Sequence, residues 1–219
     1  VVGADGIHSS VRKFLFPRTN PKSNGLSLIW AWIPRKENIY PKQSGALGGV
    51  KAGVGFFNSG EQGKSCMAFF LESKRIPRGI TPRNYRGLLR GHLKNFGDIV
   101  PKILKHLPPG KEMYLHSDYE LNLKRWYLGN VVLIGDAAHA RSVFSGAGSA
   151  LALEDALVLG HYLNQERRIG TAIRRYFQKQ YDRVEKLAMS KLSLYLQEQK
   201  GVTKYLGNFF ASSLLYSKR

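Results

Sequence analysis

The sequence predicts an α/β fold in which two strand-to-helix segments flank a β-sheet and helices complete the chain. Three observations support this fold class. Residues 131–134 form a β-branched and aliphatic run that is typical of a strand covered on both faces. Residues 26–71 alternate strand-like runs with turns, and residues after 150 carry helical patterns. With 219 residues and 43% hydrophobic content, the chain can bury a substantial core of one or two domains.

The first strand-to-helix segment is residues 1–12, VVGADGIHSSVR. Gly3 and Gly6 permit a flexible turn between strand and helix, and either Ser9 or Ser10 can cap the helix. Arg12 can face a phosphate as a fork-shaped donor. The alternative is an ordinary capped turn without a ligand.

The middle of the chain is predicted to be a β-sheet. Residues 26–33 are rich in aromatic and aliphatic side chains, and residues 53–57 are expected to pair with residues 65–71 across a turn at 58–63. Such a sheet can form the wall of a substrate pocket or simply part of the core. Residues 82–107 interrupt the strands with one or two predicted helices, indicated by the helical spacing of Tyr85, Leu88, Leu89 and Leu93.

The second strand-to-helix segment, residues 131–156, carries the most information about function. Gly135 lets the chain turn where the strand ends, and Asp136 presents a carboxylate at the position where open α/β sheets bind ligands. Gly146 and Gly148 allow a ligand to approach the backbone at the start of the next helix. The alternative is that Asp136 caps the turn and that the glycines only permit tight packing.

Two helices are predicted to follow. Residues 151–163 are apolar nearly all round, which predicts a helix buried on every side. A longer amphipathic helix is predicted from a face that is formed by Ile173, Phe177, Val184 and Ala188. The tail, residues 202–216, is aromatic and basic, and we expect it to pack as a last helix rather than to touch a membrane surface or partner.

Residues 131–156, which end in Glu154-Asp155-Ala156, resemble the second flavin motif of the class A flavoprotein aromatic hydroxylases. Residues 1–12 resemble the Asp-Gly motif of the same family, and the two motifs occur in family order. Gly-Ala-Gly followed by Leu-Glu-Asp-Ala is most similar to the salicylate hydroxylase-like branch. Val143 departs from the family, which usually has a proline there that shapes the loop against the flavin ring.

The resemblance implies a partial Rossmann-like FAD-binding domain with an inserted mixed β-sheet substrate domain and carboxyl-terminal helices. It assigns residues 1–22 to the FAD-binding domain, residues 23–126 to the substrate domain, and residues 127–219 to the return strand and the helices. No Gly-x-Gly-x-x-Gly unit opens the chain, and neither Gly53-Val54-Gly55 nor Gly146-Ala147-Gly148 replaces it. The chain is therefore expected to be the carboxyl-terminal part of a hydroxylase.

The resemblance also implies an FAD-dependent monooxygenase that consumes NADH or NADPH and O2. Such an enzyme hydroxylates or epoxidises a small aromatic or conjugated substrate through a flavin hydroperoxide. The residues that the resemblance places at the cofactor are Asp5, Gly6, Arg12, Gly135, Asp136, Ala137, Gly146, Ala147, Gly148, Ser149 and Ala150. No catalytic acid or base is assigned, and His139 is expected to be a structural loop residue. The alternative function is a non-catalytic binding or interaction fragment.

The formal charge of +19, from 34 Lys and Arg against 15 Asp and Glu, raises the question of nucleic-acid binding. The basic residues are scattered in ones and twos, and no nucleic-acid module is recognisable, so a nucleic-acid partner is not expected. Cys66 is the only cysteine, which excludes an intrachain disulfide. No apolar stretch reaches the roughly 20 residues that a membrane span needs. We expect a cytoplasmic protein without a metal site, and the sequence predicts no oligomeric state.

Overall fold

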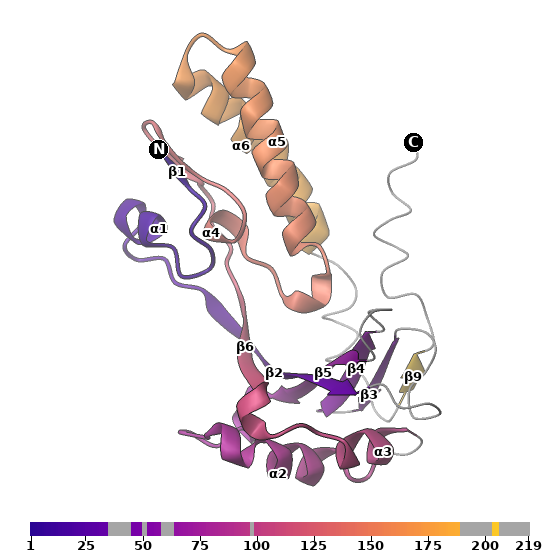
Figure 1. The fold of residues 1–219 in the computed structure, drawn as a ribbon. Helices are drawn as coiled ribbons and strands as arrows, with labels where there is room; N and C mark the ends of the chain where they lie inside the picture. The colour runs from indigo at the N-terminus through magenta and orange to yellow at the C-terminus, as the bar shows by residue number, and fades with distance from the viewer. Residues whose placement is uncertain (35–44, 50–51, 58–63, 97–98, 189–202, 206–219) are drawn as a thin grey trace. The chain divides into compact units, whose positions relative to one another are not determined.

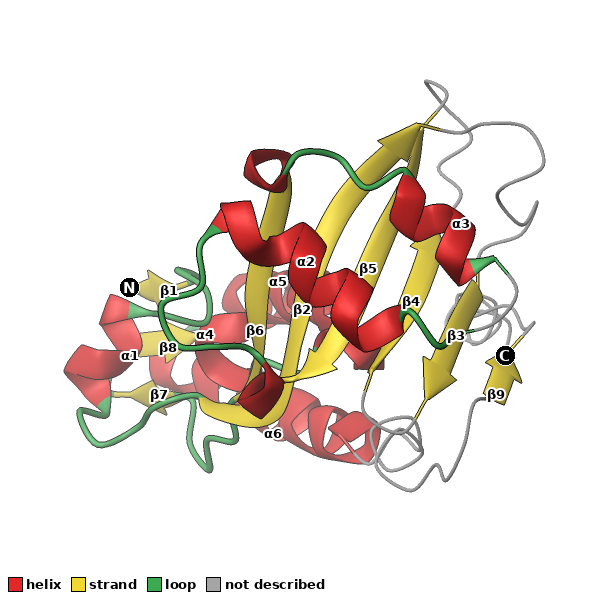
Figure 2. Ribbon diagram, turned by 90° about the horizontal axis from the view of Figure 1, so that it is seen from below, coloured by secondary structure: helices red, strands yellow, loops and turns green. Residues whose placement is uncertain are grey.

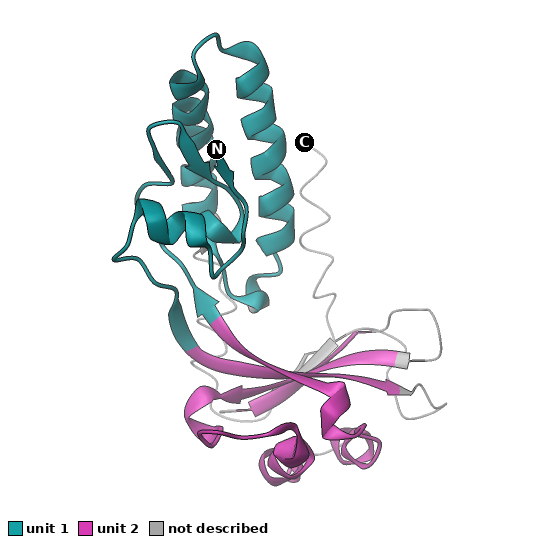
Figure 3. Cartoon of the chain, turned by 60° about the vertical axis from the view of Figure 1, so that its left-hand side comes forward, with its two compact units in different colours: residues 1–24, 119–194 teal, residues 25–118, 195–219 magenta. Residues whose placement is uncertain are grey.

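The computed structural model describes residues 1–34, 45–49, 52–57, 64–96, 99–188 and 203–205. The chain divides into two compact units (Figure 3). Unit 1 consists of residues 1–24 and 119–194, and unit 2 consists of residues 25–118 and 195–219. None of the helices in the described ranges is both long enough and apolar enough to cross a membrane.

Unit 1 contains a small sheet with strand order β1-β8-β7 (Figure 1). Strand β8 (Val131–Leu133) pairs in parallel with β1 (Val2–Gly3) and antiparallel with β7 (Tyr127–Leu128). This confirms the predicted strand at 131–134, one residue shorter than expected. Because β8 has a neighbour on each side, the apolar run that the sequence marks becomes the centre of this sheet.

Glycine is required where β1 passes between β8 and the first helix. A Cβ atom on Gly3 would lie 2.7 Å from Leu133 Cδ2 and 2.9 Å from Val11 Cβ, closer than real carbon atoms approach. The small residue therefore allows the first strand and the helix after it to pack against the central strand.

The helices of unit 1 follow its strands along the chain. They are α1 (Ser10–Leu15), α4 (Asp136–His139), the 3-10 turn η3 (Val143–Ser145), α5 (Gly148–Gln165) and α6 (Ile169–Ala188). Helices α5 and α6 lie side by side in Figure 1 and share a core with the small sheet. The sequence predicted both long helices, and α5 begins at the glycine pair as expected.

Only one face of α5 is buried, so the prediction of a helix buried all round was wrong. Leu151 and Leu159 are buried, whereas Leu153 is 69% exposed and Leu157 is 75% exposed. Composition alone could not reveal this, because it shows which side chains are apolar but not which face a neighbour covers. The amphipathic prediction for α6 was correct where its side chains are described: Ile173 and Val184 are buried.

Unit 2 is built on a six-stranded sheet with the order β6-β2-β5-β4-β3-β9. The strands are β2 (Lys22–Pro34), β3 (Gly45–Gly49), β4 (Ala52–Phe57), β5 (Lys64–Glu72), β6 (Met113–Glu120) and β9 (Thr203–Tyr205). The pairs β2-β5, β5-β4, β4-β3 and β3-β9 are all antiparallel. The predicted pairing of residues 53–57 with 65–71 is confirmed, with Val54 opposite Phe69. The predicted turn at 58–63 lies outside the described residues.

Helices α2 (Pro82–Leu93) and α3 (Val100–Lys105) cover one face of this sheet (Figure 2). Two 3-10 turns, η1 (Ser73–Arg75) and η2 (Gly110–Glu112), flank them. The prediction of one or two helices in residues 82–107 is confirmed, and Leu89 and Leu93 reach the core as their spacing indicated.

The prediction of a last helix over residues 202–216 was wrong in part. Residues 203–205 form a strand that pairs with β3, with Ala46 opposite Tyr205. Threonine and tyrosine favour strands, and an available sheet edge outweighs a weak local helical pattern. The remainder of the predicted helix lies outside the described residues.

Candidate functional site

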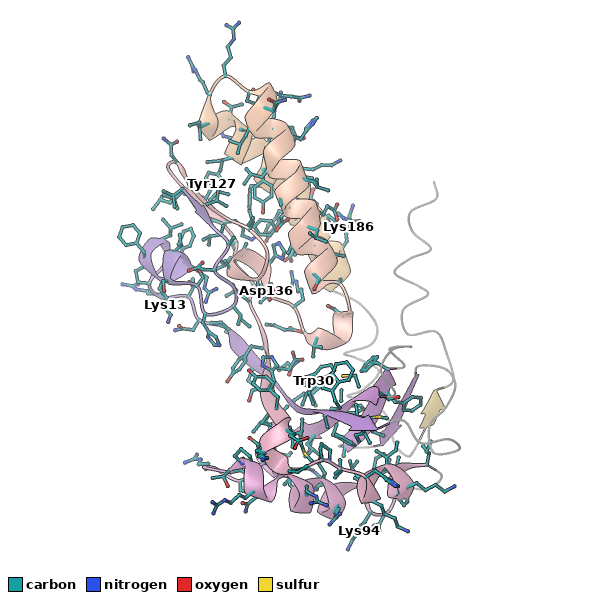
Figure 4. All side chains as sticks on the ribbon, viewed as in Figure 1. Lys13, Trp30, Lys94, Tyr127, Asp136 and Lys186 are labelled. Atoms are coloured by element: carbon teal, nitrogen blue, oxygen red, sulfur yellow. The ribbon has the colours of Figure 1, made fainter. Side chains whose placement is uncertain are left out.

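The turn after β8 is shaped by Gly135. Its φ of 58° lies in the left-handed region, which costs a glycine little and strains other residues. A Cβ atom on Gly135 would also lie 3.1 Å from the Cβ of Ala152 on α5. Glycine therefore suits both the left-handed backbone conformation and the close packing against α5. Asp136, the next residue, is exposed at the first position of α4 (Figure 4).

The two halves of the second motif meet in space. A Cβ atom on Gly148, the first residue of α5, would lie 3.9 Å from Asp136 Oδ1. No side-chain hydrogen bond caps this end of α5 among the described residues, so its first-turn amides are available to an outside acceptor. Gly146 has a φ of 62°, and the N–H of Ala147 donates to Ser145 Oγ over 3.3 Å. A carboxylate acceptor therefore lies beside a helix end that offers donors.

Asp155 is the centre of a buried polar network beneath this turn. Its Oδ2 accepts the N–H of Gly135 at 2.7 Å and lies 2.6 Å from His139 Nε2. Its Oδ1 accepts a hydrogen bond from Gln180 Nε2 at 3.1 Å. Asp155 is fully buried and His139 nearly so. The network joins α5 and α6 to the turn that carries Asp136.

Sequence reasoning missed this network. His139 was expected to be a structural residue in a loop, but it ends helix α4 and pairs with Asp155. One signal was present in the sequence: Asp155 stands four residues from both Leu151 and Leu159, on the face of α5 that is buried. A carboxylate on a buried helix face requires partners, because an unpaired buried charge is very costly.

Aromatic side chains enclose the network. The ring of Trp126 lies 4.7 Å from that of His139 and 6.1 Å from that of Tyr176. Tyr176 donates a hydrogen bond from its hydroxyl to the carbonyl of Leu133, at 3.3 Å. Burial raises the pKa of Tyr176, and the nearby Asp155 carboxylate raises it further. The phenol therefore remains protonated and acts as a donor to the central strand.

The first motif forms a capped turn. Ser9 Oγ accepts the backbone N–H of Arg12 at 2.8 Å, which confirms one of the two predicted caps. Asp5 Oδ2 accepts the N–H groups of Ser10 at 2.7 Å and Val11 at 3.2 Å. Burial alone would raise the pKa of the Asp5 carboxyl, but hydrogen bonds from Ser9, Val11 and Ser10 outweigh it and lower the pKa. Asp5 is thus held as a carboxylate at the start of α1.

Arg12 connects the two motifs. Its side chain is fully buried, and its terminal nitrogens donate to the carbonyls of Ala137 at 3.2 Å and Ile7 at 2.6 Å. Burial lowers the pKa of Arg12, and the charge of Asp5 partly opposes that shift. Because both terminal nitrogens are occupied by backbone carbonyls here, a contact between Arg12 and a phosphate stays a prediction.

The predicted cofactor residues occupy three neighbouring stretches of unit 1. Asp5 and Gly6 precede α1, and Arg12 links that stretch to the one around α4. The remaining positions are Gly135, Asp136 and Ala137 at the turn, and Gly146, Ala147, Gly148, Ser149 and Ala150 at the start of α5. Within the described ranges, no group of three or more His, Cys, Asp and Glu side chains could hold a metal ion.

Unit 2 presents an aromatic sheet face opposite to its helices. On β2, Ile29, Ala31 and Ile33 face the helical core, so Trp30 and Trp32, which alternate with them, face the other way. Trp30 (Figure 4) stacks with Phe57 of β4, with ring centroids 6.0 Å apart, and Trp32 is 54% exposed.

The chain resembles known flavoproteins in sequence and in fold. Residues 110–189 match a family model described as "FAD binding domain". The 2-heptyl-3-hydroxy-4(1H)-quinolone synthase of Pseudomonas aeruginosa (strain UCBPP-PA14) is 32% identical over 164 residues, which are 73% of this chain and 41% of that protein. The Aurachin C monooxygenase/isomerase of Stigmatella aurantiaca is 27% identical over 180 residues, 80% of this chain and 45% of that protein.

A solved structure supports the same relationship. A variant of HpxO from Klebsiella pneumoniae, complexed with FAD, superimposes with a TM-score of 0.78 at 25% sequence identity. The superposition covers 89% of this chain and 51% of that protein. The chain thus spans about half or less of the length of these three relatives.

Proposed function

This chain belongs to the family of class A FAD-dependent aromatic monooxygenases, and from that premise we propose that unit 1 holds the ribityl and ring portions of FAD. The observation that carries the proposal is the approach of Asp136 Oδ1 to the start of α5 at Gly148. This short distance brings together an exposed carboxylate, which can accept hydrogen bonds from sugar-like hydroxyls, and a helix end with free amide donors.

The residues present fit the chemistry of this cofactor. A carboxylate such as that of Asp136 accepts hydrogen bonds from ribityl hydroxyls, and such charge-assisted bonds are strong. The amides of Gly148, Ser149 and Ala150, in the first turn of α5, provide donors for the electron-rich edge of a flavin ring, and the positive end of the α5 dipole favours negative charge there. The absence of side chains at Gly146 and Gly148 leaves the backbone accessible.

When bound, FAD would supply electron transfer from NADH or NADPH and the activation of O2 that hydroxylation of an aromatic ring requires. The role of the protein itself is to position the cofactor. Asp136 orients the cofactor, the α5 end stabilises negative charge on it, and the Asp155 network keeps the turn between them in one geometry.

We propose a small aromatic or conjugated molecule as the substrate. The Trp30 and Phe57 pair on the sheet of unit 2 supports this class, because aromatic rings pack favourably against flat apolar molecules. The names of two relatives, a quinolone synthase and the 6-methylsalicylate 1-monooxygenase of Aspergillus terreus, refer to ring compounds and agree with it.

Titration of the purified chain with FAD tests the proposal. We expect flavin fluorescence to change saturably, with an affinity weaker than about micromolar because this sequence has no Gly-x-Gly-x-x-Gly unit for the FAD pyrophosphate. Oxidation of NADH or NADPH in air by the loaded chain would support the monooxygenase function. A chain that stays colourless and leaves both nucleotides unchanged would instead support a non-catalytic binding or interaction fragment. The effect of an Asp136 substitution on FAD affinity identifies the site.

A further inference from the structure

A pocket of about 550 Å³ lies within unit 1. Two segments and one side chain line it: residues 18–24, residues 120–123 and Arg141. None of the residues predicted to hold FAD lines this pocket. Its volume is in the range of small-molecule sites.

Arg141 is a buried cation whose hydrogen-bonding capacity is incompletely used by the chain. Its side chain is only 8% exposed. It donates to Glu185 Oε1 at 3.3 Å, which is longer than the 2.7 to 2.9 Å of close charge-assisted hydrogen bonds. Its Nε atom is shielded from solvent and has no acceptor among the described residues. Buried donors without a partner are rare in native proteins, so we expect the Arg141 guanidinium to bind a second acceptor.

The remaining pocket residues combine positive charge with apolar surface. Arg18 and Lys22 add two exposed cations, and Glu120 is the one carboxylate among the lining residues. The apolar part of the lining includes Leu121 and Leu123, of which only 3% and 5% is exposed. Positive charge exceeds negative charge in this lining, which favours an anion with an apolar body over a neutral or cationic ligand.

We propose that this pocket binds a small organic acid, whose carboxylate pairs with Arg141 and whose apolar body packs on Leu121 and Leu123. A planar guanidinium is suited to a carboxylate, because its fork of N–H groups can donate two parallel hydrogen bonds. This site is independent of the proposed flavin site and does not require FAD.

Calorimetric titration of the purified full chain, without FAD, tests the proposal with 2-naphthoate as the probe. Its neutral analogue 2-naphthol has the same ring body without the carboxylate, and inorganic phosphate is an oxyanion without a ring. We expect 2-naphthoate to bind one-to-one and at least about tenfold more tightly than 2-naphthol, the gain of one charge-assisted bond.

The variant Arg141→Lys keeps the positive charge beside Glu185 but lacks the planar fork. We expect it to weaken 2-naphthoate binding about tenfold and to leave 2-naphthol binding unchanged. Arg183→Lys is the matched control, because Arg183 also pairs with a glutamate, Glu154, but does not line the pocket. Lys22→Gln, at an exposed position, should weaken 2-naphthoate binding about two- to fivefold and serves if Arg141→Lys does not fold.

Three results would overturn the proposal. They are the absence of saturable 2-naphthoate binding at millimolar concentrations, equal affinities for 2-naphthoate and 2-naphthol, and equal losses in Arg141→Lys and Arg183→Lys. Phosphate that binds with dependence on Arg141, where 2-naphthoate does not, would also overturn it and would assign the pocket to an inorganic oxyanion.

Discussion

Asp155 accepts a hydrogen bond from the backbone N–H of Gly135 at 2.7 Å, although the two residues are 20 positions apart in the sequence. The same Asp155 oxygen lies 2.6 Å from His139 Nε2, so a single oxygen contacts both ends of the turn around α4. Because Asp136 follows Gly135 directly, the placement of its carboxylate depends on α5 being docked in this register. The conformation of the proposed flavin site is therefore determined by a buried side chain that lies outside it.

Replacement of Asp155 by alanine should destabilise the chain. The N–H groups of Gly135 and Gln180 would lose their acceptor in a fully buried place, which costs about 1 to 3 kcal/mol for each such group. Urea unfolding should show a loss of at least about 2 kcal/mol. Glu154→Ala is the matched control, since its partner Arg183 is half-exposed and such surface pairs contribute about 1 kcal/mol or less. Equal losses in the two variants would contradict a structural role for the Asp155 network.

Much of the site could be predicted from sequence because it is local. The strand at Val131–Leu133, the turn at Gly135 and the start of α5 at Gly148 each follow from residues that are adjacent in the chain. The Asp155 network joins residues 16 to 25 positions apart, and no local pattern shows which of them meet. The exposure of Leu153 could not be predicted for the same reason, because it depends on which face of α5 a neighbouring element covers.

Asp5 should make the stability of the chain depend on pH in the acid range. Because hydrogen bonds lower the pKa of Asp5 below its ordinary value of 3.8, its contribution to stability is present above that value and is lost as pH falls through the lower, folded-state pKa. The carboxylate is exposed, so the effect should be about 1 kcal/mol or less. Urea midpoints at neutral pH and near pH 3 should differ less in Asp5→Asn than in the unmodified chain. An identical pH dependence in both proteins would show that these hydrogen bonds do not favour the carboxylate.

Asp136→Ala should weaken FAD binding without unfolding the chain, because Asp136 is exposed and begins a short helix. A hydrogen bond to a charged group is worth about 1.5 to 3 kcal/mol, which corresponds to about a ten- to hundredfold loss of affinity. Flavin fluorescence measures the affinity, and far-UV circular dichroism monitors the fold. Asp182→Ala, which removes an exposed carboxylate from α6, is the control and should leave FAD affinity unchanged. An unaltered affinity in Asp136→Ala would remove this residue from the proposed site.

Gly148→Val should block the cofactor while sparing the fold. A first side-chain carbon at this position would stand 3.9 Å from Asp136 Oδ1, an ordinary contact that the protein accommodates. The branched methyl groups, however, would extend into the space beside the first amides of α5, where the flavin ring is proposed to lie. The affinity for FAD should fall by about tenfold or more, equivalent to at least about 1.4 kcal/mol.

Gly160→Val is the matched control for this change, because Gly160 lies on the same helix and an added Cβ atom there would meet nothing within 4 Å. Both variants replace a glycine of α5 by the same β-branched residue, Gly148 at the first position of the helix and Gly160 in its interior, and the urea midpoint of each variant measures its effect on stability. Only the difference in FAD affinity then reports on the site. If both variants bind FAD as the unmodified chain does, the start of α5 does not contact the flavin ring. If both variants lose FAD affinity equally, a change in helix α5 causes the loss and not a contact at Gly148.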